Sequence, residues 1–187
     1  MAEPIVVTGA AGKTGLAVTR ALAERGAEVR ALIRRDAQEE AVRAAGAAQV
    51  QVADLADPGA METAFEGAAA VYYICPNLRP NEAELGRLAI DTAAAAAVGR
   101  FVYHSVLHPQ AERMPHHWNK LRVEETLIAS ELEWTILQPA AYMQNLLAGW
   151  REIVGGGVYR VPYPAHSRIS LVALVDVAEV AARVLIE

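Results

Sequence analysis

Cysteine is almost absent from the sequence, with Cys75 as its only example in 187 residues. An internal disulfide is therefore excluded, and an intracellular, cytoplasmic setting is favoured. The amino end has no basic segment followed by an apolar run, so no secretory signal is visible. Long apolar runs are lacking too, because Asp91 and Arg100 bracket the most alanine-rich stretch. We expect no membrane-spanning segment.

Basic side chains are also fewer than acidic ones. The chain has 17 basic and 22 acidic side chains, which gives a net charge of −5. A mildly acidic chain without a basic tail has no electrostatic footprint for a phosphate backbone, so nucleic acid is not expected as a direct partner. The 5 histidines do not form a compact ligand set with carboxylates. No metal site is therefore expected.

Short β-branched runs alternate along the chain with longer, alanine-rich helical patterns. The runs predicted as strands are 5–8, 28–33, 49–53, 70–74, 100–104 and 134–137. The segments predicted as helices between them are 12–25, 37–45, 58–65, 81–98 and 115–130. Strands that are apolar on both faces and separated by helices are typical of a buried parallel sheet. We therefore predict an α/β fold, a Rossmann-type doubly wound parallel sheet with helices on both faces.

The pattern is looser beyond residue 140. Residues 141–153 are predicted as a helix, 158–161 and 168–171 as short strands, and 177–186 as a last helix with Asp176 as its N-cap. We expect a dinucleotide-binding core over residues 1–140. Residues 141–187 would then form a small, incomplete substrate-side lobe that closes on the same domain.

A glycine-rich loop lies between the first predicted strand and the first predicted helix. Its spacing is Gly9-x-x-Gly12-x-x-Gly15, one residue wider between the first two glycines than the common dinucleotide fingerprint. Glycines let the chain turn tightly and let a diphosphate approach the amino end of a helix, where free N–H groups favour anions. The alternative is a turn without a ligand. The residues predicted at the diphosphate are Thr8, Gly9, Gly12, Lys13, Thr14 and Gly15.

Arg34 and Arg35 follow the second predicted strand, where the 2′ position of a dinucleotide would lie. Cations suit a 2′-phosphate, whereas a carboxylate at this place is typical of NAD sites. We therefore expect NADPH, and NAD is less favoured, although Asp36 one residue later leaves some room for it. The alternative is two solvated arginines at the start of a helix.

Two further pairs of residues follow the third and fourth strands. Asp54 and Leu55 lie where an adenine ring would rest, and the carboxylate of Asp54 could accept a hydrogen bond from its amine. The alternative for Asp54 is an N-cap of the next helix. Cys75 and Pro76 lie beside the expected pyrophosphate or ribose. Cys75 is interpreted as a packing residue, because no cationic activator is near it in sequence.

These motifs, taken with three later ones, resemble the NmrA-like family of atypical short-chain dehydrogenase/reductases from about Ile5 onward. The later motifs are His116-His117-Trp118-Asn119-Lys120, Trp134-Thr135-Ile136-Leu137-Gln138-Pro139 and Tyr142-Met143-Gln144-Asn145. The resemblance implies a Rossmann domain, a preference for NADPH and members of two kinds. Some reduce quinones, dyes or other small carbonyl-like compounds, and others sense the redox state of the cofactor and bind a regulatory partner.

The resemblance also implies roles for individual residues. Lys120 would hydrogen-bond the nicotinamide ribose, and Pro139, Tyr142 and Asn145 would border the nicotinamide and the substrate. Short-chain dehydrogenases place a tyrosine four residues before this lysine, but here His116 occupies that position. A histidine on the helix face of Lys120 could do acid–base work, or it could be a first-turn residue that faces solvent. The predicted catalytic residues are Lys120, Tyr142 and His116.

Two functions are open at this point. The first is an NADPH-dependent reductase that passes hydride directly to a small-molecule electrophile such as a quinone. The second is a non-catalytic NADP(H) redox sensor that regulates a protein partner. The missing tyrosine favours the sensor. The resemblance also implies a further carboxyl-terminal segment, and this sequence ends before most of it. Either the protein lacks that segment, which would also favour the sensor, or the sequence is a fragment. Alanine-rich faces over 81–98 and 115–130 could pair two copies as a homodimer or pack within one subunit.

Overall fold

A parallel six-stranded sheet forms the centre of the computed structural model, which describes residues 3–76 and 79–187. Residues 1 and 2, at the amino end where no secretory signal is visible, lie outside the described residues. The strands are β1 (Ile5–Val7), β2 (Val29–Ile33), β3 (Gln49–Val52), β4 (Ala70–Tyr73), β5 (Arg100–His104) and β6 (Trp134–Leu137). Their order across the sheet is β3-β2-β1-β4-β5-β6. The predicted Rossmann-type α/β fold is confirmed.

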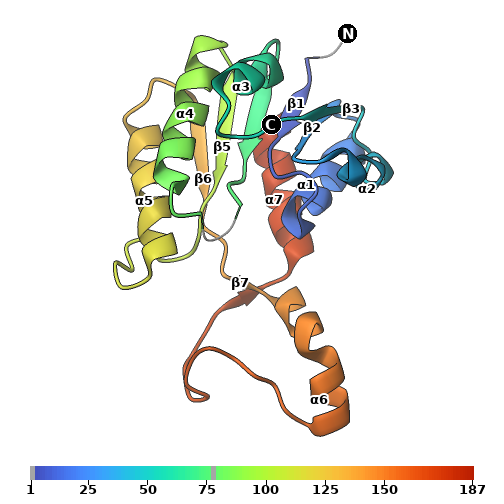
Figure 1. Ribbon diagram of the computed structural model, residues 1–187, viewed down its shortest axis with the longest axis vertical. Coiled ribbons are helices and arrows are strands. Elements are labelled where there is room, and N and C mark those ends of the chain that lie inside the picture. The colour runs from blue at the N-terminus through green and yellow to red at the C-terminus, as the bar shows by residue number, and fades with distance from the viewer. Residues whose placement is uncertain (1–2, 77–78) are drawn as a thin grey trace.

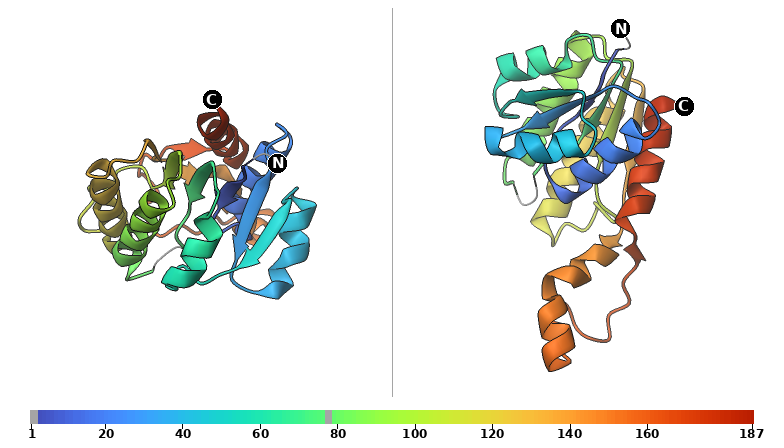
Figure 2. Two further views of the ribbon diagram at one scale, coloured as in Figure 1. Left: turned by 90° about the horizontal axis from the view of Figure 1, so that it is seen from above. Right: turned by 90° about the vertical axis from the view of Figure 1, so that its right-hand side faces the viewer.

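Helices cover both faces of this sheet (Figures 1 and 2). One face carries α1 (Lys13–Ala23), α2 (Glu39–Ala44) and α7 (Leu174–Ile186). The other face carries α3 (Pro58–Phe65), α4 (Glu82–Ala95) and α5 (Pro115–Ile128). A 3-10 turn, η1 (Asp36–Gln38), precedes α2, so the helix predicted over 37–45 begins with a tighter turn. The result is three layers with one apolar core on each side of the sheet.

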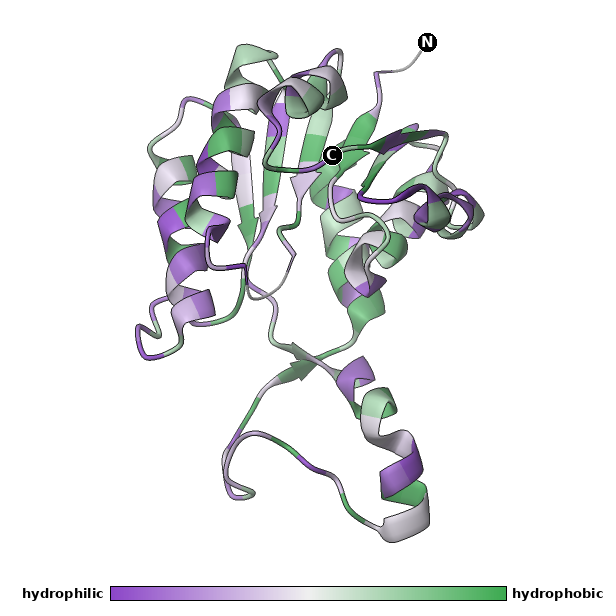
Figure 3. Ribbon diagram, viewed as in Figure 1, coloured by the Kyte–Doolittle hydropathy of each residue, from purple (hydrophilic) through white to green (hydrophobic). Residues whose placement is uncertain are grey.

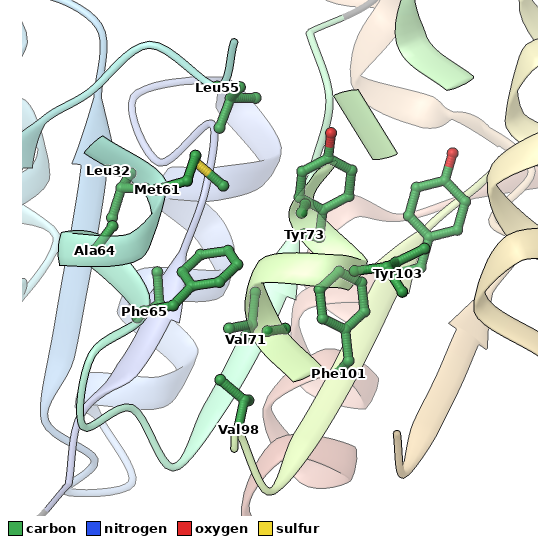
Figure 4. Close-up of a cluster of buried hydrophobic side chains, with 14 of the residues drawn as sticks. Leu32, Leu55, Met61, Ala64, Phe65, Val71, Tyr73, Val98, Phe101 and Tyr103 are labelled. Atoms are coloured by element: carbon green, nitrogen blue, oxygen red, sulfur yellow. The ribbon is translucent and has the colours of Figure 1, made fainter. Parts of the chain in front are cut away.

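Alternate residues of each strand enter the two cores, as expected for strands buried on both faces. In β1, Val6 packs toward α3 and α4, whereas Val7 packs toward α1 and α7. The core between the sheet and helices α3, α4 and α5 is called the first core. Phe65 and Phe101 fill its centre, where both are fully buried (Figure 4). Burying a side chain of this size contributes roughly 1.5–3 kcal/mol. Apolar residues accordingly concentrate in the strands (Figure 3).

The chain beyond residue 140 departs from the prediction. The helix predicted over 141–153 is wrong at its start, because β7 (Ala141–Tyr142) is extended and pairs in parallel with β8 (Leu171–Val172). A 3-10 segment, η2 (Met143–Gly149), and α6 (Trp150–Gly156) follow β7 and project from the core (Figure 1). The strand predicted over 158–161 does not form, because its residues are mostly exposed and have no neighbouring strand to pair with.

The last helix, α7, begins earlier than predicted. Its N-cap is Ala173, so the prediction of Asp176 as N-cap is wrong, and Asp176 lies within the first turn. The reason is a contact from elsewhere in the chain: the Gln144 side chain accepts a hydrogen bond from the backbone N–H of Leu174 at 3.0 Å. The buried face of α7 then joins the core beside α1. Among residues 3–76 and 79–187, no helix has the length and apolar character needed to cross a bilayer.

Tyr73 and Tyr103 lie side by side in the first core, with their hydroxyls toward the same end of the sheet (Figure 4). The Tyr103 hydroxyl donates to Glu82 at 3.2 Å, whereas the buried Tyr73 hydroxyl has no partner among the described residues. A buried polar group without a partner destabilises the folded state.

We therefore expect Tyr73→Phe to raise the free energy of unfolding by about 1 kcal/mol, as measured by urea denaturation. Tyr103→Phe is the matched control and should lower the free energy of unfolding, because it leaves an acceptor of Glu82 without its donor. Equal destabilisation by both substitutions would contradict this assignment.

Candidate functional site

A cleft of about 690 Å³ opens at the carboxyl ends of β1, β2, β4 and β5. It lies at the point between β1 and β4 where the strand order reverses, so that the connections on its two sides run to opposite faces of the sheet. Ligands of open parallel sheets bind in this crevice. The cleft is therefore the place where the fold itself predicts a ligand.

Most of the predicted site residues line this cleft. They are Gly9, Gly12, Lys13, Thr14, Arg34, Asp54, Leu55, Cys75, Pro76, His116, Lys120, Pro139, Tyr142 and Asn145. The wall of the cleft does not include Thr8, Gly15 or Arg35. Thr8 and Gly15 are buried beneath the glycine loop, and Arg35 is exposed beside the cleft.

The glycine loop is held in place from below. The Thr8 hydroxyl donates to the Ile74 carbonyl at 3.0 Å and accepts from the Ile74 N–H at 2.8 Å, which ties the end of β1 to the end of β4. Gly9 has a φ of +57°, a left-handed conformation that favours glycine. A Cβ at Gly15 would lie 2.3 Å from the Gly9 carbonyl oxygen. Only glycine at this position lets α1 pack directly on the loop.

The loop and the helix after it fit a diphosphate. Gly12 is the N-cap of α1, and no side chain of its own occupies the cap. The first turn of any helix leaves N–H groups without helical acceptors, and the helix dipole favours an anion there. Gly9 and Gly12 line the cleft without a side chain, so an anion can reach the backbone. The geometry of this structure therefore suits the predicted pyrophosphate position.

Arg34 lies at the other end of the cleft, directly after β2. Gln38 accepts hydrogen bonds from the backbone N–H groups of Arg34 at 3.0 Å and Arg35 at 3.1 Å, which fixes the turn. The Arg34 side chain is exposed and takes part in none of the ion pairs found among the described residues. Its guanidinium is therefore available to an anion in the cleft.

Asp54 lies on the cleft wall after β3, where the sequence allows two interpretations. Its carboxylate accepts from the backbone N–H of Ala56 at 3.0 Å. The N-cap of α3 is Asp57, which accepts from the N–H of Ala60 at 3.2 Å. The interpretation of Asp54 as an N-cap is therefore wrong, and Asp54 lines the cleft together with the buried Leu55.

Lys120 reaches the cleft from within the protein. Its side chain is buried, and its ammonium pairs with Glu82 of α4 at 2.7 Å. Glu82 is itself buried and also accepts from the Tyr103 hydroxyl. Burying a charge is costly unless the charge is paired and hydrogen-bonded, and Glu82 supplies that pairing for the Lys120 ammonium. Glu82 could not be recognised from the sequence, because a carboxylate in the first turn of a helix usually faces solvent.

His104 is a second residue that sequence reasoning missed as a site residue. It ends β5 at the cleft, and its two ring nitrogens contact two tyrosine hydroxyls. Nδ1 lies 2.7 Å from Tyr72 Oη, and Nε2 lies 2.8 Å from Tyr142 Oη. Burial lowers the pKa of His104 to about 3, so the ring is neutral at physiological pH. A histidine at the carboxyl end of a buried parallel strand is the signal that could have found it.

His116 and Cys75 both line the cleft, and both have shifted pKa values. His116 is partly exposed, and burial together with His117 and Lys120 lowers its pKa, so its ring is largely neutral. The His116 side chain also lines the cleft, so it does not face solvent alone. Burial raises the pKa of the Cys75 thiol to about 12, which agrees with the interpretation of Cys75 as a packing residue.

The first turn of α1 is joined to the segment after β7 across the cleft. Lys13 Nζ donates to Asn145 Oδ1 at 2.6 Å and lies 5.4 Å from the centre of the Tyr142 ring. Thr14 Oγ1 donates to Tyr142 Oη at 3.2 Å. Residues that the sequence places at the diphosphate and at the substrate therefore touch one another directly.

The comparisons with known proteins agree with this architecture. The model of the NmrA-like family matches residues 1–186. This chain therefore belongs to the NmrA-like family, and the resemblance seen in the sequence is confirmed.

Two relatives cover nearly the whole chain. An NAD(P)H azoreductase of Xenophilus azovorans is 30% identical over 186 residues, which are 97% of this chain and 63% of the relative. The solved structure of NADPH-dependent quinone oxidoreductase QOR2 of Escherichia coli complexed with NADPH has a TM-score of 0.86 and 28% identity. It matches over 98% of this chain and 65% of that protein. The chain thus spans somewhat less than two thirds of the length of these relatives.

The close packing of Gly15 on the glycine loop gives a direct test. Gly15→Ala places a Cβ against backbone atoms, so α1 or the loop must move, and we expect the free energy of unfolding to fall by about 2 kcal/mol. Gly59→Ala in α3 is the control, because its Cβ would meet only Asp57 Oδ1 at 3.6 Å. Urea denaturation should show the control unchanged or slightly more stable. Equal stability of the two variants would contradict the packing described here.

Proposed function

We propose that this protein is an NADPH-dependent reductase of quinones or other small electrophiles. The observation that carries the proposal is a single cleft with the glycine loop at its centre, the exposed Arg34 at one end and a polar cluster at the other. The relatives named as an NAD(P)H azoreductase and an NADPH-dependent quinone oxidoreductase support it.

The cofactor would extend along the carboxyl edge of the sheet. We propose that the loop from Gly9 to Thr14 holds its diphosphate, that Arg34 holds the 2′-phosphate, and that Asp54 and Leu55 border the adenine. The nicotinamide end would lie beside Lys120, Cys75, Pro76, Pro139, Tyr142 and Asn145. Because Arg34 favours the phosphorylated ribose, NADPH is the proposed cofactor and NADH the weaker one.

The residues around the nicotinamide end would orient the reactants and handle charge. A bound reduced nicotinamide supplies the hydride, which is the chemistry that the protein itself lacks. Lys120, held by Glu82, would place an N–H donor where negative charge develops on the substrate. Burial raises the pKa of Tyr142, so its phenol stays protonated and can donate a proton. His116, largely neutral at the rim, is a second proton carrier.

Two parts of the chain would then have separate roles in binding the cofactor and the substrate. Residues 1–140 form the cofactor side, and the segment from residue 141 forms the substrate side through Tyr142 and Asn145. The end of that segment, α7, packs into the core beside α1. Quinones and azo dyes suit such a site because they accept hydride readily, without strong activation by the protein.

Turnover distinguishes the reductase from a redox sensor. We expect the purified protein to oxidise NADPH in the presence of a quinone, with the loss of absorbance at the nicotinamide band as the readout. NADPH without quinone is the control for spontaneous oxidation. Tight binding of NADPH without turnover on a panel of quinones, azo dyes and aldehydes would favour the sensor and contradict the reductase.

Arg34 and its neighbour allow a matched test of cofactor choice. We expect Arg34→Ala to weaken NADPH binding by about tenfold or more, because a charge-assisted contact to the 2′-phosphate is lost. NADH binding should be nearly unchanged. Arg35→Ala removes the same charge outside the cleft wall and should leave both affinities close to wild type. Calorimetric titration measures both, and equal losses in the two variants would place the selection elsewhere.

A further inference from the structure

The hydroxyl of Tyr142 is the end of a hydrogen-bonded chain that begins in the core. Tyr72 is fully buried in β4, and its hydroxyl contacts His104 Nδ1. His104 Nε2 contacts the Tyr142 hydroxyl, which also accepts from Thr14. The chain therefore joins β4, β5, β7 and the first turn of α1 at one point on the cleft wall.

Counting hydrogens fixes the direction of this chain. A neutral histidine has one N–H and one acceptor nitrogen. The Tyr72 hydroxyl is buried, and among the described residues its hydrogen-bond partner is His104. If Nδ1 carried the hydrogen, the hydrogen of Tyr72 would be buried without an acceptor, which is costly. Tyr72 therefore donates to Nδ1, and the imidazole hydrogen is on Nε2.

This direction determines which hydrogen bonds the Tyr142 hydroxyl can accept and donate. Its oxygen accepts from His104 Nε2–H at 2.8 Å and from Thr14 Oγ1–H at 3.2 Å. Both of its acceptor positions are then occupied, and its own O–H points to neither donor. The remaining direction is the cleft, which Tyr142 lines.

We propose that His104 and Tyr72 are positioning residues that orient the Tyr142 hydroxyl as a proton donor toward the substrate. This inference rests on the proposed reductase function. It goes beyond that function by assigning the proton path to residues from two core strands, and it explains why the cleft can lack a tyrosine at position 116.

The proton step balances as follows. A substrate that accepts a hydride from the reduced dinucleotide gains two electrons and one proton, and negative charge is left on its oxygen or nitrogen. The O–H bond of Tyr142 breaks and the proton forms a bond to that atom, which leaves a phenolate. The Nε2–H of His104 and the hydroxyl of Thr14 stabilise the phenolate. Water then returns a proton to Tyr142.

Nitrogen NMR of the free protein, labelled with ¹⁵N at histidine, tests the assignment without any cofactor. We expect His104 to be a neutral ring with its hydrogen on Nε2, and its signals are identified by their loss in His104→Gln. Tyr72→Phe removes the donor to Nδ1 and should shift His104 toward the other tautomer. Tyr73→Phe is the matched control on the same strand and should leave the spectrum of His104 unchanged. A hydrogen on Nδ1 in the wild type would overturn the proposal.

Kinetics with NADPH and a quinone test the consequence. We expect kcat to fall by about tenfold or more in Tyr142→Phe and in His104→Leu, whereas the affinity for NADPH changes little. His104→Gln, which keeps a side-chain N–H near Nε2, should recover part of the loss. Tyr73→Phe should retain the wild-type kcat. Wild-type kcat in folded His104→Leu would overturn the proposal.

The two experiments separate this inference from the proposed function. A wild-type protein that neither binds nor oxidises NADPH contradicts the reductase, while the histidine spectrum still supports or overturns the direction of the chain. A protein that oxidises NADPH, but whose His104 variants match the Tyr73→Phe control, contradicts the positioning role alone.

Discussion

The position of β1 between β2 and β4 is the constraint on which the site depends. All six strands are parallel, so their carboxyl ends share one edge, and the reversal of order at β1 leaves a crevice there. Thr8 bonds the end of β1 to Ile74 beyond β4, and Gly15 lets α1 lie directly on the loop between them. The shape of the glycine turn, with backbone open to the cleft, is thus a consequence of strand pairing and close packing.

Polar and charged side chains are buried at the same carboxyl edge of the sheet. The Lys120–Glu82 ion pair is buried at the carboxyl edge, and His104 is neutral because burial opposes its charged form. Each of these groups is satisfied by partners from other elements, which is the condition for burying polar groups without a large loss of stability. Tyr73 and Arg79 are exceptions in this region, since the Tyr73 hydroxyl and Arg79 Nε are buried without a partner among the described residues. The residues behind the cleft therefore hold Lys120 and His104 in position, and their packing keeps the His104 ring neutral.

The fold was predictable because its signals are local. Apolar runs with intervening helical patterns gave all six strands, and the glycine spacing with Arg34 gave the centre and one end of the cleft. The segment after residue 140 was not predictable, because β7 depends on pairing with β8, far along the chain, and the start of α7 depends on Gln144. The roles of Glu82 and His104 could not be predicted from the sequence for a similar reason. Their roles come from contacts with residues between 16 and 38 positions away, which no local pattern reveals.

We propose that one cleft, built around the glycine loop, holds the whole dinucleotide. The most direct test is an amide NMR titration of the folded wild-type chain with NADPH. The account predicts that the signals that move lie in three places: the loop from Gly9 to Thr14, the residues just after β2 and β3, and the stretch around Tyr142. Signals of α6 should stay in place. Movement confined to the opposite edge of the sheet, or no movement in the glycine loop at millimolar NADPH, would contradict the account.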